Sequence, residues 1–249
     1  MASNVVSAPA ATVSIIPTIT LIAELERVIA NASVQRRVEI LTHIADLFVS
    51  GSARFVKEDI ELFDDLFTRL VLVIESAAKS ALAERLARVA NAPFNVVRML
   101  ASDNDIKVAH PILAHSLQLD DATLVLSART KSQAHLLAIS QRQSVSEAVT
   151  DVLVERGNKP VVHCLAGNPG AKFSEGGFAL LVNCSANDDT LAIAIGSRAD
   201  VPPHILSNLL EMASEMVQMK FTAENVRREF SIFEPRFSFF GNEAPLLVV

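Results

Sequence analysis

The sequence contains neither tryptophan nor tyrosine, and glycine is scarce, with 8 residues in 249. Strand-rich proteins use aromatic residues and glycine-marked turns more freely. Half of the residues are hydrophobic and a fifth are charged, which suffices for a packed interior and excludes wholesale disorder. The composition therefore favours an α-helical protein of one or two domains.

Positive charge is missing from the start of the chain, where the first 23 residues hold no Lys or Arg. A secretory signal needs such charge, and Pro9 and Pro17 interrupt the only N-terminal apolar stretch. No apolar run reaches the about eighteen residues of a transmembrane helix. Two cysteines, Cys164 and Cys184, are too few for a disulfide framework. We expect a cytoplasmic protein with no membrane partner.

Basic residues are in the minority, with 22 Lys and Arg against 28 Asp and Glu and a formal net charge of −6. Nucleic-acid-binding proteins normally carry a basic surplus or a basic stripe. The densest charge cluster is acidic, from Glu58 to Asp65, and is typical of a solvated helix face. We therefore expect no binding to nucleic acid, DNA included.

Motifs of known chemistry are also missing. There is no G-x-S-x-G nucleophile elbow, and Gly167-Asn168-Pro169-Gly170 lacks the Gly-Lys-Ser/Thr that completes a P-loop. His163 and Cys164 are adjacent in a predicted helix, so their side chains point in different directions. His110 and His115 form a His-x4-His pair, but no acid accompanies it in the pattern of a zinc site. We predict no catalytic residue, no metal and no cofactor, which favours a protein that is not an enzyme.

Apolar residues at three- and four-residue spacing begin near Thr20 and predict helices. Ser33 is the expected N-cap of a helix that ends at Gly51. A longer helical stretch follows from about Lys57 to Ala90, with a break near Ser76. We interpret residues 1–19 as a flexible tail and 20–92 as an N-terminal helical region.

A repeat of 28 residues follows in the sequence. Leu137, Leu165 and Ile193 are each followed by Ala at this interval, and Ser146, Ser174 and Pro202 recur as helix starts. Upstream, 105–117 and 120–130 form another predicted helix pair. Units of a short helix, a turn and a longer helix bury their apolar faces by stacking. We predict an all-α fold with an α-α superhelix, a HEAT-like solenoid, over residues 93–225.

Several segments resemble a large bacterial family known only as a conserved domain of unknown function. They are ELFDDLFTRL, IKVAHPILAHS, SQAHLLAISQRQSVSEAVTDVLVERGN and LAGNPGAKFSEGGF. The likeness runs from about residue 20 to about residue 220, and the motif from Ser132 through Gly157 is its specific part. The family resembles HEAT-like and leucine-rich-repeat-variant α-solenoids. The resemblance implies this fold and supplies no activity.

Six polar residues at or near the turns of the predicted repeats are the candidate binding residues. They are Ser132, His135, Arg142, His163, Asn168 and Arg198. His135 and His163 occupy the same position of successive repeats, which predicts adjacent helices and a shared orientation. Such residues can bind a partner's carboxylates or backbone, or they can bond helix-terminal carbonyls within the protein.

The end of the repeat region is a single predicted helix from Pro202 toward Phe221. One apolar stripe consists of Ile205, Leu209, Met212, Met216 and Met219. A second stripe lies beside it, which indicates burial on two sides. Residues 226–249 form a Phe-rich C-terminal tail. We expect either that this tail caps the last helix or that a homodimer forms through the helix.

The function hypothesis is a protein–protein interaction or scaffolding module, in bacterial signalling or stress regulation. One alternative is a small-molecule-binding protein or lyase-type enzyme on a helical-repeat scaffold. Another is a homo-oligomeric structural protein. The residues do not identify the partner.

Overall fold

The structure is a computed structural model that describes residues 24, 25, 27–29 and 31–222. These residues are largely helical and form no β-strand, and the one β-type contact among them is a parallel bridge between Val145 and Ala171. The prediction of an all-α protein is confirmed. Across the same residues, no helix has the length and apolarity needed to cross a membrane.

The helices are short and follow one another closely. Their bounds are Val34–Gly51 (α2), Lys57–Val71 (α3), Ser76–Leu86 (α4), Phe94–Ala101 (α5), Ile106–His115 (α6), Asp121–Thr130 (α7), Gln133–Ser140 (α8), Glu147–Arg156 (α9), Lys159–Gly167 (α10), Glu175–Cys184 (α11), Asp189–Gly196 (α12) and Pro203–Met212 (α13). A 3-10 turn, Ser52–Arg54 (η1), follows α2, and residues 215–222 are again helical.

The helix boundaries follow local sequence signals. Ser33 caps α2 by accepting a hydrogen bond from the backbone N–H of Arg36 at 3.3 Å. Asp120 and Asp188 cap α7 and α12 in the same way. The expected break between α3 and α4 is observed. The helices α9, α11 and α13 begin at the interval of 28 residues that the sequence predicted.

The single helix predicted from Pro202 to Phe221 is wrong. α13 ends at Met212, and Ala213 is extended with φ −77° and ψ 152°. The Oγ of Ser214 then accepts a hydrogen bond from the N–H of Val217 at 3.4 Å and starts a new helical segment. The sequence pattern alone did not reveal this second cap.

The break also divides the predicted apolar stripe. Val217 and Phe221 are buried, and the ring of Phe221 lies against Gly196. Met216 and Met219 are instead 71% and 70% exposed. The expected tails, 1–19 and 226–249, lie outside the described residues.

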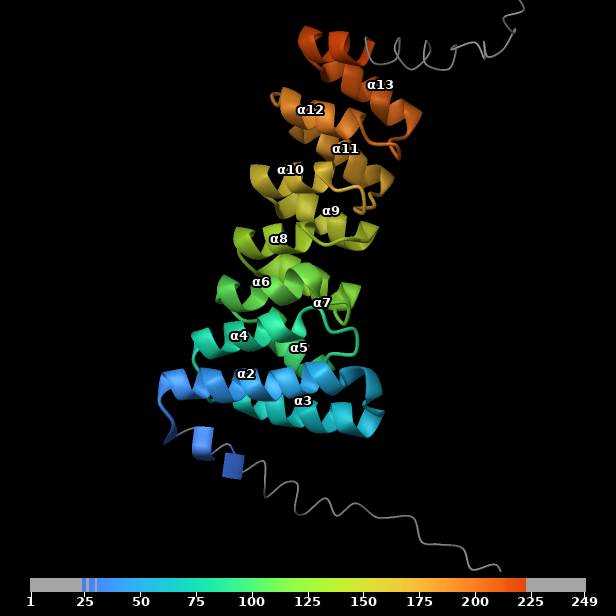
Figure 1. Ribbon diagram of the computed structural model, residues 1–249. Helices are drawn as coiled ribbons and strands as arrows, with labels where there is room; N and C mark the ends of the chain where they lie inside the picture. The colour runs from blue at the N-terminus through green and yellow to red at the C-terminus, as the bar shows by residue number, and fades with distance from the viewer. Residues whose placement is uncertain (1–23, 26, 30, 223–249) are drawn as a thin grey trace, which may run out of the picture. The chain divides into compact units, whose positions relative to one another are not determined.

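The chain divides into two compact units between Gly177 and Phe178. In the first unit, α2, α4, α6, α8 and α10 contact one another in that order, and we call them the even layer. In the same unit α3 contacts α5 and α7 contacts α9, and we call these four helices the odd layer (Figure 1). The two layers contact each other through the pairs α4–α5, α5–α6, α7–α8, α8–α9 and α9–α10.

Candidate functional site

Arg142, which follows α8, is a buried cation that joins two helices of the even layer. Its two terminal nitrogens donate to the carbonyl oxygens of Leu113 and Ser116, each at 2.7 Å, at the end of α6. Its Nε is buried without a hydrogen-bond partner. Burial lowers the pKa of the guanidinium, and the carboxylate of Asp121 acts in the opposite direction. The guanidinium therefore serves as a cap for the C-terminus of α6.

Asn168, which follows α10, has the same role one helix later. Its amide donates to the carbonyls of Ser140 at 2.9 Å and Arg142 at 2.8 Å, at the end of α8. Gln118, after α6, similarly donates to the carbonyl of Ala90 beyond α4. Successive helices from α4 to α10 in the even layer are thus joined by side chains that bond carbonyls at or just beyond the end of the preceding helix.

His135 is also bonded inside the protein. Its Nε2 lies 3.0 Å from the carbonyl oxygen of Asp103 and its Nδ1 lies 2.8 Å from the Oγ of Ser132. A carbonyl only accepts, so Nε2 carries the proton and Nδ1 accepts from the hydroxyl. Both ring nitrogens are therefore used, and the ring is only 2% exposed.

His163 lies on α10, which contacts α8, so the prediction that it and His135 are on adjacent helices is confirmed. The shared orientation of the two rings stays a prediction. In the part of the chain that the structure describes, no three His, Cys, Asp or Glu side chains are grouped as metal ligands are.

Arg198, in the second unit, makes a different contact from Arg142. Its Nε and a terminal nitrogen donate to the two carboxylate oxygens of Asp200, both at 2.8 Å. Of the six candidate residues, the structure joins Ser132 to His135 and Asn168 to the backbone of Arg142. These contacts match the internal role that the sequence left open, and partner binding by these residues stays a prediction.

Asp103 anchors His135 to the α5–α6 loop. Its carboxylate accepts from the N–H of Asp105 at 2.9 Å and from Lys79 at 3.2 Å. Burial raises the pKa of this carboxyl, but the Asp105 N–H, Lys79 and the charge of Lys131 together hold it below its usual value.

Replacing Asp103 with asparagine is expected to lower the free energy of unfolding at pH 7 by about 1–2 kcal/mol, because the charge-assisted bond to Lys79 is lost. The pKa of Asp103 is lower in the folded protein than in the unfolded chain, so its ionised carboxylate stabilises the fold at pH values above the unfolded pKa. This stabilisation is lost as the pH falls through the folded pKa. Urea unfolding of both proteins should therefore show a difference that shrinks below about pH 4. A difference that stays constant down to about pH 3 would contradict this assignment.

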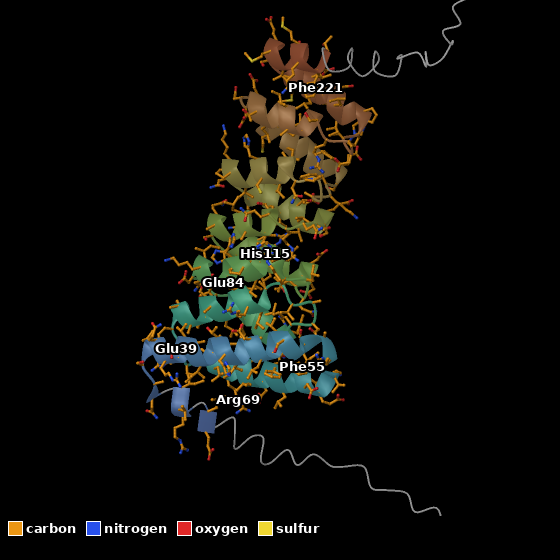
Figure 2. The ribbon with its side chains drawn as sticks, viewed as in Figure 1. Glu39, Phe55, Arg69, Glu84, His115 and Phe221 are labelled. Carbon is orange, nitrogen blue, oxygen red and sulfur yellow. The ribbon has the colours of Figure 1, made fainter. Side chains whose placement is uncertain are left out.

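An open groove lies between α4 and α6 in the even layer. It has a volume of about 410 Å³ and is lined by Ser80, Glu84, Ile106, Lys107, His110 and Pro111. Figure 2 shows Glu84 on α4 and His115 at the end of α6. The groove combines exposed charged side chains with a partly buried apolar floor of Ile106 and Pro111. Such a surface can hold an apolar side chain and pair with charges beside it.

A proline inside α6, Pro111, lines the groove. Pro111 has no N–H to donate to the carbonyl of Lys107, four residues earlier. The hydroxyl of Ser80, on α4, donates to that carbonyl instead, at 2.9 Å. The proline thus ties α6 to α4 along the groove.

Replacing Ser80 with alanine is expected to lower the free energy of unfolding by about 1 kcal/mol, since the Lys107 carbonyl loses its donor. In a Pro111→Ala background the restored N–H of residue 111 can serve that carbonyl, so the same replacement should cost almost nothing. Urea unfolding of the parent, the two single variants and the double variant gives the coupling free energy between Ser80 and Pro111. Equal costs in the two backgrounds would show that the proline does not create the need for Ser80.

Two histidines of α6, His110 and His115, lie at or beside the groove. The Nε2 of His110 lies 3.1 Å from the Oε1 of Gln141, which links the groove to the end of α8. Burial lowers the pKa of His115, and the positive charges of Arg88, His110 and Arg142 lower it further. Sequence reasoning missed this site because it examined His110 and His115 only as a metal-ligand pair. The available signal was the proline within the helical pattern.

Residues 108–230 match a family described as an uncharacterised protein conserved in bacteria (DUF2336). The match includes His110 and Pro111 of the groove, and Arg142 and Asn168 of the carbonyl contacts. It begins further along the chain than the likeness expected from about residue 20. No curated protein and no solved structure matches the chain. The chain is similar, over this range, to an uncharacterised bacterial domain.

Proposed function

We propose that the protein is a protein-binding or scaffolding module, built as a HEAT-like α-α superhelix, and that a partner protein binds the α4–α6 groove. The observation that carries this proposal is the form of the groove. Small-molecule sites are usually enclosed and mostly apolar. Here the hollow is open, crosses two helices and carries both signs of charge, which suits a segment of another protein.

The helix contacts support a repeat architecture. In a repeat array each unit contacts only its neighbours. The even-layer helices contact one another in order along the chain. The side chains of Arg142 and Asn168 also reach carbonyls 26 to 29 residues earlier, close to the 28-residue repeat.

Affinity capture with groove variants tests the proposal. The immobilised protein is compared with Lys107→Glu, in the groove, and Arg129→Glu, an exposed cation on α7 in the odd layer. The two variants change the net charge equally. We expect a bacterial protein to be retained by the parent and by Arg129→Glu and lost with Lys107→Glu. Retention by all three would place binding elsewhere, and an empty capture would contradict a binding function. The identified partner would test the hypothesis of a role in signalling or stress regulation.

Self-association is a second candidate, favoured by one observation. Met212, Met216 and Met219 are 45%, 71% and 70% exposed, and methionine adapts well at contact surfaces. Light scattering of the full chain and of a chain ending at Thr222 tests it. Dimers in both cases support pairing through this surface, whereas a monomer in both removes it.

A further inference from the structure

Charge is divided between the two layers of the first unit. The even layer, α2, α4, α6, α8 and α10, carries the carboxylates Glu39, Asp46 and Glu84. Its Lys and Arg residues are Arg36, Arg37, Lys79, Arg85, Lys107 and Lys159. The odd layer carries the opposite excess, with the carboxylates Glu58, Asp59, Glu61, Asp64, Asp65, Asp121, Glu147, Asp151 and Glu155 against Lys57, Arg69, Arg98, Arg129 and Arg156.

Part of the even-layer charge is already paired. Lys79 binds Asp103 at 3.2 Å, and Arg85 binds Asp46 of α2 at 3.0 Å. Lys107 and His110 are exposed in the wall of the groove, and His115 and Arg88 are exposed beside it. The exposed Lys and Arg at the groove are therefore Lys107, on α6, and Arg88, just beyond the end of α4, and the lining carboxylate is Glu84, on α4.

We propose that the occupant of the groove is an acidic segment of a partner protein, with carboxylates that pair with Lys107, His110 and Arg88 and an apolar side chain that contacts Ile106 and Pro111. This proposal rests on the proposed function and names the chemical class of the partner. Complementary charge of this kind accelerates association and excludes basic competitors. Glu84 disfavours a carboxylate placed directly beside it, so the carboxylates of the segment are expected at Lys107 and Arg88.

A protein segment fits this surface better than a nucleic acid or a membrane. A phosphate polymer presents charge at every unit, and it would meet Glu84 in the groove and the acidic odd layer beyond it. A lipid surface is broad, whereas the apolar residues here, Ile106 and Pro111, are confined to one open groove between two helices. A short acidic and apolar segment needs only the width of the groove.

Defined peptides test the inference by fluorescence anisotropy. The probes are a labelled pool of random twelve-residue peptides of Asp, Glu, Leu and Phe, and a matched pool with Asn and Gln in place of the acids. We expect only the acidic pool to bind. Binding should weaken about tenfold with Lys107→Glu and remain unchanged with Arg129→Glu. Raising the salt concentration should weaken it further. Circular dichroism confirms that both variants keep their helices.

The other outcomes overturn the inference. Equal binding of the neutral pool, equal losses in both variants, or no binding of any pool would each exclude an acidic segment as the occupant. Binding of anionic phosphatidylserine vesicles or of single-stranded RNA, without binding of the acidic pool, would replace the protein partner by a membrane or a nucleic acid. If affinity capture still loses a protein with Lys107→Glu while the acidic pool fails, the proposed function stands and only the partner class is wrong.

Discussion

Replacing Arg142 with alanine is expected to lower the free energy of unfolding by about 3 kcal/mol. The substitution leaves the carbonyls of Leu113 and Ser116 without the donors that now lie at 2.7 Å. It also opens a cavity at the end of α6, because Arg142 is only 8% exposed. Relief of the buried charge offsets part of this loss, which is why the expected cost does not exceed the sum of two charge-assisted hydrogen bonds.

Two further variants separate the contributions. Arg142→Met fills much of the same volume without donors, so its cost measures the hydrogen bonds. Arg142→Lys keeps the charge, but its single nitrogen lacks the guanidinium fork that serves both carbonyls, and we expect little rescue. Chemical unfolding of the three variants and of Arg88→Ala, an exposed neighbour, gives the comparison. Wild-type stability in the methionine variant would show that the carbonyl contacts contribute nothing net.

The helices could be predicted from the sequence because their signals are local. A capping side chain such as Ser33 or Asp120 acts within three residues of itself, and the apolar spacing is read along one helix. The break after Met212 was not predicted, because its signal is not visible in the local apolar spacing. Ser214 is a cap in the middle of continuous apolar spacing, and only the tertiary packing of Phe221 on Gly196 shows why the chain turns there.

For the candidate residues, the sequence predicted positions but not side-chain contacts. The repeat register placed Arg142 and Asn168 correctly at helix ends, because turn positions recur with the period. It gave no direction for the side chains, and the structure turns both of them toward carbonyls of the preceding helix. The groove and the division of charge depend on which helices share a layer, and no local pattern contains that information. A net charge of −6 concealed a basic layer for the same reason.

The loops that follow α8 and α10 carry the second large prediction. The N–H of Val145 donates to the carbonyl of Gly170 at 3.0 Å, and the N–H of Lys172 donates to the carbonyl of Val145 at 2.9 Å. This pairing brings the backbone of Gln143 so close to Gly170 that a Cβ there would lie 1.8 Å from the Gln143 oxygen. The segment LAGNPGAKFSEGGF, which carries part of the family resemblance, therefore has a structural role in joining two loops.

Replacing Gly170 with alanine is expected to lower the free energy of unfolding by about 2–3 kcal/mol, because a backbone oxygen cannot move aside as a side chain would. The added methyl group must separate the loops and weaken both hydrogen bonds of Val145. Gly167→Ala is the matched control, since a Cβ at that position meets nothing within 4 Å. Gly167 ends α10, where alanine is expected to be neutral or slightly stabilising. Urea unfolding of both variants measures the contrast. Equal stabilities would show that the loops are not held together through Gly170, which would leave the Asn168 contacts and the packing of α8 on α10 to maintain the joint.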